Sequence, residues 1–209
     1  MNGNGASFGK RFLEHLTERW YVYVLWAVFA VITCIWIFSM VTSAGKAKKI
    51  TVFVSGYECN VKGLHDKLSE EMPQGIEEIA VRYALVSDVN YGVYYSTVAL
   101  VDSDIIILPE SRVFGDDCEA KFCALSLALA REYFGENEYY SVGGNAYGIR
   151  VYDKTTGSGA CKDFITYSRA GNAEENYWLF FNKSSMHLGE FAGSESNSAV
   201  TVAKRLLSL

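Results

Sequence analysis

One uncharged segment of this 209-residue chain constrains its fold more than any other feature. Trp20 to Thr42 reads WYVYVLWAVFAVITCIWIFSMVT, 23 residues without Asp, Glu, Lys or Arg. As a helix, such a segment can cross a hydrocarbon core of roughly 30 Å. Aromatic residues towards both ends, Trp20 and Trp36 among them, are typical of segments that meet lipid headgroups. A buried core helix is the alternative, but it would rarely lack a polar face over this length. The sequence therefore predicts a transmembrane helix over residues 20–42.

The flanks of this segment predict how it is arranged. The apolar run exceeds the roughly 7–15 residues of a signal-peptide core, so an uncleaved anchor is favoured over a signal peptide cleaved near Thr42-Ser43-Ala44. Three basic residues on each side give a tie under the positive-inside rule: Lys10, Arg11 and Arg19 against Lys46, Lys48 and Lys49. Because a short tail before an anchor usually stays in the cytosol, we expect a cytoplasmic tail (1–19), a linker (43–49) and an extracytoplasmic domain (50–209). The protein would then be a single-pass protein of the cell membrane.

The charge of the part after the anchor excludes one class of partner. Residues 46–209 carry 16 Lys and Arg against 22 Asp and Glu, a net charge of −6. Nucleic acids and anionic lipid surfaces recruit proteins through an excess of basic residues. We therefore expect no nucleic-acid partner, and no membrane contact beyond the anchor.

Alternating short patterns predict the fold class. Runs rich in β-branched residues predict buried strands over 50–54, 79–83 and 104–108. Apolar stripes between them predict two helices, the first capped by Asn60 and carrying Val61, Leu64, Leu68 and Met72, the second carrying Tyr91, Tyr94, Val98 and Val101. This order predicts an α/β domain with a mostly parallel sheet and flanking helices.

The second half of the domain predicts one long helix, two strands and a closing helix. Asp116 and Glu119 resemble a capping box, the apolar stripe runs from Cys118 to Phe134, and Gly135 is placed to end the helix. Strands are expected over 147–153 and 177–182, and a helix over 198–209. Gly143-Gly144-Asn145 is too short for a phosphate loop and predicts a tight turn.

Reactive side chains give little support for catalysis. The chain has no G-x-S-x-G or HExxH motif, and neither His65 nor His187 has a local partner that would activate a nucleophile. With only three histidines and no CxxC pair, we expect no metal site and no cofactor. Four cysteines follow the anchor, Cys59, Cys118, Cys123 and Cys161, and either two disulfides or four buried thiols are compatible with the sequence.

The stretch DIIILPES, residues 104–111, points to a ligand site. In open α/β sheets, ligands bind beyond the carboxyl ends of the strands. Pro109 ends one strand and would place Glu110, Ser111 and Arg112 at the rim. Ser55 and Tyr57 end the first strand. We expect these five residues to contact a ligand, with solvated loop residues as the alternative.

Several short strings, in the order ITVFV, DIIILPES, YGIRVYD, YWLFFNKSSMHLG and NSAVTVAKRLLSL, resemble extracytoplasmic solute-binding proteins of bacterial ABC importers, which have the type II periplasmic-binding fold. The resemblance spans most of residues 50–209. It implies a periplasmic-binding-like fold and a role in solute binding or transport. This domain has about 160 residues, whereas two-lobed members are considerably larger, so the resemblance implies a truncated or single-lobed relative held by a membrane anchor.

Two functions are compatible with the sequence. The first is a non-enzymatic domain that binds a small solute or supports an ABC-type transporter. The second is an interaction subunit of a membrane complex without a ligand of its own. An exposed apolar patch away from the strand ends would favour the second function.

Overall fold

The computed structural model describes residues 20–42, 45–168 and 174–209. The chain divides into two compact units, one ending at Ala44 and one running from Gly45 to Leu209. The predicted cytoplasmic tail, 1–19, lies outside the described residues, as do residues 43 and 44 of the predicted linker.

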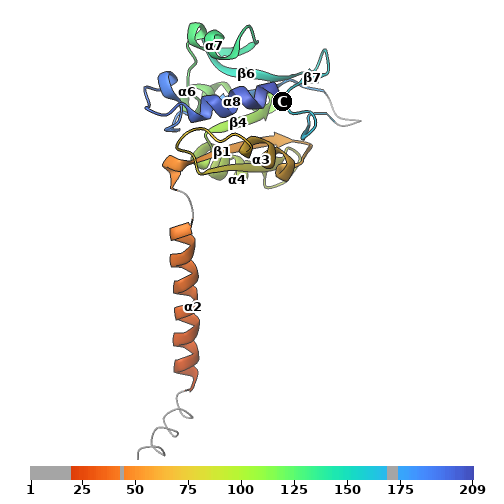
Figure 1. Cartoon of the computed structure of the whole chain (residues 1–209). Helices are drawn as coiled ribbons and strands as arrows, with labels where there is room; N and C mark the ends of the chain where they lie inside the picture. Colours follow the sequence, from red (N-terminus) through yellow and green to blue (C-terminus); the bar gives the residue numbers. More distant parts are fainter. Residues whose placement is uncertain (1–19, 43–44, 169–173) are drawn as a thin grey trace, which may run out of the picture. The chain divides into compact units, whose positions relative to one another are not determined.

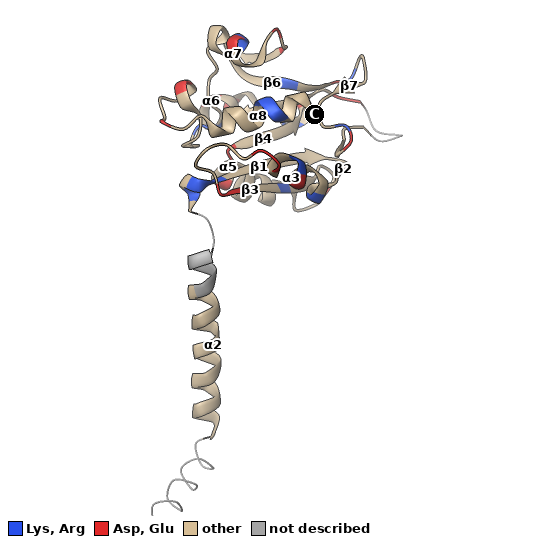
Figure 2. Ribbon diagram, viewed as in Figure 1, with Lys and Arg blue, Asp and Glu red and all other residues tan. Residues whose placement is uncertain are grey.

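Helix α2 spans Trp20–Thr42, the bounds that the uncharged run predicts. Figure 2 shows no Lys, Arg, Asp or Glu along its described length. The Thr33 hydroxyl donates to the Phe29 carbonyl at 2.8 Å and so needs no partner outside the helix. By length and composition the helix can cross a membrane, and an N-terminal signal sequence has the same properties.

A seven-stranded mixed sheet forms the centre of the second unit (Figure 1). Its order is β3-β1-β4-β9-β6-β5, with β7 paired to β6. The bounds are β1 Lys49–Gly56, β3 Glu78–Leu85, β4 Ile105–Pro109, β5 Tyr139–Val142, β6 Asn145–Asp153, β7 Ser158–Gly159 and β9 Tyr177–Phe181. The α/β class is confirmed. Parallel pairing joins β1 to β3 and β4, the strands of the predicted alternation, and the other ladders are antiparallel.

Helices cover both faces of this sheet because alternate residues of the buried strands point to opposite sides. Val52 and Val54 of β1 belong to one core, with α3 (Val61–Ser69) and α8 (Ser198–Ser208). Phe53 belongs to the other core, with the helical segment α4 (Tyr91–Tyr94), η2 (Tyr95–Ala99) and α5 (Leu100–Asp102). The predicted cap of α3 is confirmed, since the Asn60 side chain accepts from the Gly63 amide at 2.9 Å.

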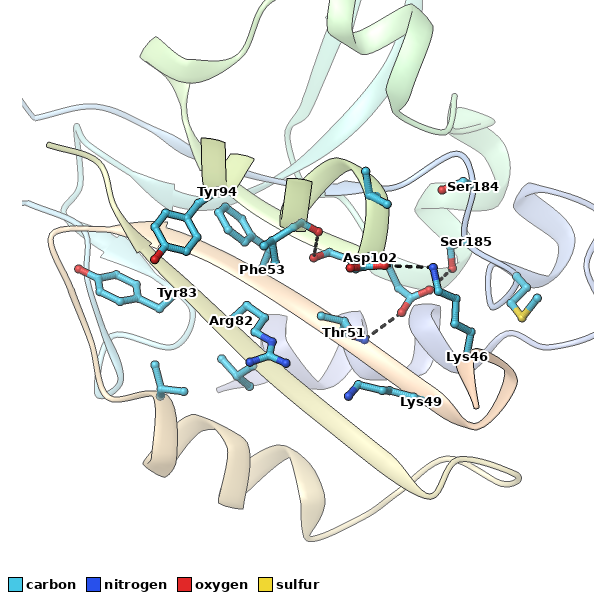
Figure 3. Close-up of a pocket in the computed structure, with 17 residues that line it drawn as sticks. Lys46, Lys49, Thr51, Phe53, Arg82, Tyr83, Tyr94, Asp102, Ser184 and Ser185 are labelled. Carbon is cyan, nitrogen blue, oxygen red and sulfur yellow. Dashed lines mark hydrogen bonds and ion pairs between the residues drawn. The ribbon is translucent and has the colours of Figure 1, made fainter. Parts of the chain in front are cut away.

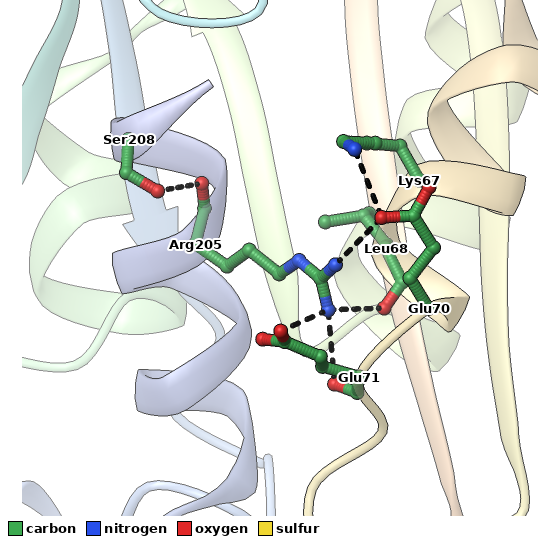
Figure 4. Close-up of polar contacts among 6 residues, drawn as sticks. All are labelled: Lys67, Leu68, Glu70, Glu71, Arg205 and Ser208. Atoms are coloured by element: carbon green, nitrogen blue, oxygen red, sulfur yellow. Dashed lines mark hydrogen bonds and ion pairs between the residues drawn. The ribbon is translucent and has the colours of Figure 1, made fainter.

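One arginine ties α3 to α8. The Arg205 guanidinium, on α8, donates to the carbonyls of Leu68 and Glu71 at 3.3 and 3.1 Å, and it lies 3.4 Å from a Glu70 carboxylate oxygen (Figure 4). Leu68 belongs to the last turn of α3, where carbonyls lack a partner within the helix, and Glu71 lies in the turn that follows. The contact fixes the closing helix beside the first helix of the domain.

The long helix predicted from Asp116 to Gly135 is wrong. The structure has two helices, α6 (Gly115–Lys121) and α7 (Leu127–Phe134), separated by an extended stretch. In that stretch Phe122 forms a bridge to Asn182 and Leu125 forms one to Ala146. The Phe122 ring stacks on Phe180 at 4.4 Å, a tertiary contact that outweighs helical continuity. Asp116 is therefore a residue of the first turn of α6 and not its cap.

Two turn predictions in this half are confirmed. Gly135 has φ +76° and ends α7, and Gly143 and Gly144, with φ +58° and +86°, connect β5 to β6. Strands β5 and β7 and the ribbon of β2 (Glu58–Cys59) and β8 (Ile165–Thr166) were not predicted from the sequence. All five cysteines are free, and Cys118, Cys123 and Cys161 are buried, so the structure has the thiol alternative rather than disulfides.

Candidate functional site

The sheet has a topological switch point between β1 and β4. The chain leaves β1 through α3 for β3 on one side, and it leaves β3 through the α4–α5 segment for β4 on the other. Adjacent strands whose connections diverge leave a crevice at their carboxyl ends. Val54 pairs with Ile107, so Ser55 and Gly56 lie level with Leu108 and Pro109.

The structure places all five predicted ligand residues at this edge but not all at its surface. Ser55 is fully buried, contrary to a rim position. Tyr57 is half-buried, and its amide donates to the Thr166 carbonyl at 3.1 Å. Glu110, Ser111 and Arg112 form the short helix η3 (Glu110–Arg112), where Ser111 is exposed and the other two are half-buried.

Antiparallel β9 brings further residues to the same edge. Asn176 donates through Nδ2 to Glu110 Oε2 at 3.0 Å, and the Ser111 amide donates to Glu175 Oε2 at 2.8 Å. Tyr177 pairs with Pro109. These residues were not predicted, because they precede a strand: an antiparallel strand begins at the edge where its parallel neighbours end. Asn176 directly before the apolar run 177–181 was the available signal.

Buried polar atoms without partners gather at this edge. Among the described residues, five buried side-chain polar atoms have no hydrogen-bond partner, and four of them belong to Ser55, Tyr91, Tyr177 and Trp178. Ser55 and Trp178 both lie level with Leu108 across the sheet. A buried hydroxyl left unpaired costs about 1–3 kcal/mol, so such a cluster needs a physical reason.

The electrostatics of these groups show how closely they lie. Burial raises the pKa of Tyr91, while the Ser55 hydroxyl and the Arg112 charge act in the opposite direction. The Ser55 and Tyr91 hydroxyls thus lie close to each other, but they do not form a hydrogen bond of ordinary geometry. The Arg112 guanidinium carbon lies 4.9 Å from the centre of the Tyr91 ring. Burial also raises the pKa of Tyr177, and Glu175 and Tyr57 add to that effect. We call these residues the switch-point site: Ser55, Tyr57, Tyr91, Glu110, Ser111, Arg112, Glu175, Asn176, Tyr177 and Trp178.

A separate groove of about 800 Å³ lies along β3 (Figure 3). Its lining includes none of the five predicted residues. The sheet contributes Lys49, Thr51, Phe53, Val81, Arg82 and Tyr83, helix α3 contributes Val61, the α4–α5 segment and the residues after it contribute Tyr94, Val98, Val101, Asp102, Ser103 and Asp104, and the remaining lining residues are Lys46, Ser184, Ser185 and Met186. Figure 3 shows Tyr83 and Tyr94 at one end and Lys46 and Ser185 at the other. We call this cavity the β3 groove.

Asp104 closes one end of the β3 groove. Its carboxylate accepts from the Thr51 amide at 2.8 Å and from the Ser185 hydroxyl at 2.6 Å. Burial raises its pKa, although these two hydrogen bonds act in the opposite direction. Nearby, His187 is buried between the Ser196 hydroxyl and the Lys46 carbonyl, at 3.1 and 3.0 Å. Both histidine nitrogens are thus engaged, and Nε2 joins His187 to the start of the domain. Within the described residues, no group of three or more His, Cys, Asp or Glu side chains is arranged to hold a metal ion.

The similarity of this chain to known proteins is weak. No protein-family model and no curated protein matches this chain. A solved structure of the N-glycan transport solute-binding protein NgtS from Streptococcus pneumoniae, in complex with Man1GlcNAc, aligns with 14% identity and a TM-score of 0.33. The alignment covers 51% of this chain and 25% of NgtS, so this chain spans only a quarter of that protein. A similarity at this level carries no argument about ligand or mechanism.

Proposed function

We propose that this chain is a membrane-anchored extracytoplasmic domain that binds a small solute at the switch-point site, without catalysis, and so serves solute uptake by an ABC-type transporter. The observation that carries the proposal is the cluster of unpaired buried polar atoms on Ser55, Tyr91, Tyr177 and Trp178. Protein folds rarely leave four such atoms unpaired near the ends of adjacent strands, here with Tyr91 and Trp178 in the core on one face of the sheet and Tyr177 in the core on the other. A polar ligand or ordered water supplies the missing partners.

The groups at the site define the chemistry of the solute. Hydroxyls donate and accept, the Trp178 indole donates, and the Glu110 carboxylate accepts from hydroxyl or amine groups. Tyrosine and tryptophan rings supply flat apolar surface beside these groups. A small solute with several hydroxyl or amine groups and a ring fits this set better than a purely apolar one.

A single sheet also limits how the solute is held. Two-lobed binding proteins close by a hinge around their ligand. The second unit of this chain has one central sheet and no second lobe among its described residues. We therefore propose that the side chains covering these buried atoms move aside to admit the solute, with a partner such as the transporter completing the enclosure.

The test is thermal unfolding of the full chain in lipid nanodiscs against sugars, amino acids, short peptides and metal ions. A solute that binds only the folded state stabilises it by about 2.7 kcal/mol at a hundredfold excess over its dissociation constant. We expect the rise in melting temperature to disappear in Tyr91→Phe, which removes an unpaired hydroxyl and should itself cost little stability. Glu110→Ala should reduce the rise as well.

Tyr133→Phe is the matched control. Its ring lies 5.6 Å from Phe191, which packs on Phe181 at the opposite end of β4. This variant should keep the full response. A flat response to every solute from a chain that unfolds cooperatively contradicts the proposal, as does a response that Tyr91→Phe leaves unchanged.

A further inference from the structure

The outer edge of β3 is open. Among the described residues, β3 pairs with β1 only and ends the sheet. An edge strand of eight residues presents unpaired N–H and C=O groups at alternate residues, a template for another strand. The β3 groove follows this edge, since its lining includes Val81, Arg82 and Tyr83 of β3.

Elements from both faces of the sheet flank this edge. Val61 of α3 lines the groove on one face, and Tyr94 and Val98 line it on the other. A strand added to β3 would therefore place its alternate side chains against two separate walls. A small solute could fill part of this volume but would leave most of the backbone row unpaired.

The groove also has an exposed apolar wall. Tyr94 and Val101 are 50% and 58% exposed, and Met186 is 52% exposed. Tyr94, Val98 and Val101 share one side of a helical segment whose middle, Tyr95–Ala99, is a π-helix. Irregular helical segments of this kind are frequent at functional sites, and a contiguous exposed apolar patch is typical of an interaction surface.

The charges of the groove select the partner. Lys46 pairs with Asp102 at 3.0 Å and Lys49 pairs with Glu78 at 2.5 Å, so these cations are already neutralised. Asp104 is occupied by Thr51 and Ser185. Arg82 is exposed, and no acidic side chain of the described residues lies within ion-pair distance of its guanidinium. The charged side chain of the groove that lacks a partner among the described residues is therefore a cation, Arg82, and it would attract an acidic group.

We propose that an extended, acidic segment of a partner protein adds to the edge of β3, with a carboxylate on Arg82 and apolar side chains against Tyr94 and Val98. Strand addition of this kind takes affinity from main-chain hydrogen bonds and specificity from alternate side chains. A charged residue on an edge strand also discourages indiscriminate pairing, so Arg82 both protects the edge and selects an acidic strand. This proposal does not rest on the switch-point site.

The test begins with a phage-displayed library of random dodecapeptides, selected on the full chain in lipid nanodiscs and depleted on empty nanodiscs. We expect the enriched peptides to alternate apolar β-branched residues with at least one Asp or Glu. A synthetic peptide of the enriched sequence then measures affinity. Arg82→Glu should weaken it on the order of tenfold, because the reversal replaces an attraction by a repulsion, and Arg82→Gln should weaken it less.

Two comparisons separate strand addition from simple charge attraction. Arg131→Glu, on α7, reverses another exposed arginine and should leave peptide affinity unchanged. Peptides methylated at alternate backbone nitrogens should fall into two groups, one that no longer binds and one that binds normally, because only one set of amides faces β3.

Four outcomes overturn the proposal. They are a selection that enriches no alternating acidic sequence, an affinity that Arg82→Glu does not lower, binding that tolerates methylation of every amide, and occupation of the edge by a second copy of this chain. The last would appear as disulfide-linked dimers of Ala80→Cys in nanodiscs that hold two copies. Because Arg82 is not part of the switch-point site, Arg82→Glu should leave solute-induced stabilisation unchanged. Failure of strand addition at β3 can therefore be distinguished from failure of solute binding.

Discussion

At the scale of single residues, Asp104 connects the start of β4 to β1 and to the residues that follow β9. Its carboxylate binds the Thr51 amide of β1 and the Ser185 hydroxyl, and its own amide donates to the Thr51 carbonyl at 2.8 Å. The Asn182 amide donates to the Asp104 carbonyl at 3.0 Å. Aspartate at this position therefore aligns β4 with β1 and β9, although burial of its charge is unfavourable.

The pH dependence of stability at acid pH should reveal the cost of burying the Asp104 charge. Burial raises the pKa of Asp104 above its ordinary value of 3.8. As the pH rises through 3.8 the unfolded chain releases the proton first, so this group lowers the free energy of unfolding until the folded pKa is passed. Asp104→Asn removes this pH-dependent loss of stability. The variant also lacks one carboxylate oxygen as a hydrogen-bond acceptor, which costs about 1 kcal/mol at any pH. Urea unfolding of both chains should be measured at a series of pH values. As the pH rises from 3.8, the free energy of unfolding of the variant should increase relative to that of the wild type, and above the folded-state pKa the difference should stay constant. A difference that moves the other way, or not at all, contradicts the assignment.

At the scale of elements, β6 and β9 pack through a glycine. Gly148 pairs with Phe180, and a Cβ added at Gly148 would lie 2.7 Å from the Phe180 ring. The same ring stacks on Phe122, in the stretch that separates α6 from α7. The close approach of β6 thus leaves room for the aromatic pair that interrupts the helix.

Gly148→Ala should therefore destabilise the domain, and a second glycine provides the control. We expect a loss of about 1–3 kcal/mol, as for overpacking in a filled core. Gly92 lies in α4 with nothing within 4 Å of its added Cβ, so Gly92→Ala should stabilise by about 0.5–1 kcal/mol. Chemical unfolding of the two variants and the wild type measures whether each substitution lowers or raises the free energy of unfolding. A Gly148→Ala chain as stable as the wild type would show that Phe180 can move aside.

The elements also show how far the sequence predicts this protein. The strands β1, β3 and β4, their parallel pairing and the cap of α3 follow from local patterns, and they were confirmed. The break after Lys121 was not predictable, because Phe122 fits a helical stripe as well as it fits the core. At the candidate site, Ser55 and Arg112 lie at the sheet edge that the sequence predicts, whereas Tyr91 and Tyr177 were not among the predicted residues. Their roles depend on a helix start and an antiparallel strand that meet only in three dimensions.

At the scale of the whole molecule, the chain joins an uncharged helix to an acidic domain that has its own cores. A transporter-associated solute receptor would require this domain to face the outside of the cell. The charges that flank α2 do not decide this, since three basic residues lie on each side. Because the flanking charges are balanced, a change of one or two basic residues should shift the orientation.

A chain with one epitope tag before Met1 and another after Leu209 tests the orientation. In spheroplasts treated with protease we expect the second tag to be digested and the first to be protected, both on one uncleaved polypeptide in the membrane fraction. A cleaved signal sequence would instead remove the first tag and release the domain. Replacing Lys10 and Arg11 with Gln leaves more positive charge after the helix than before it, so we expect part of the population to invert. Protection of the second tag in the unmodified chain would place the domain in the cytosol. That result would contradict the proposed role in solute uptake, and it would leave strand addition at β3 open to a cytosolic partner.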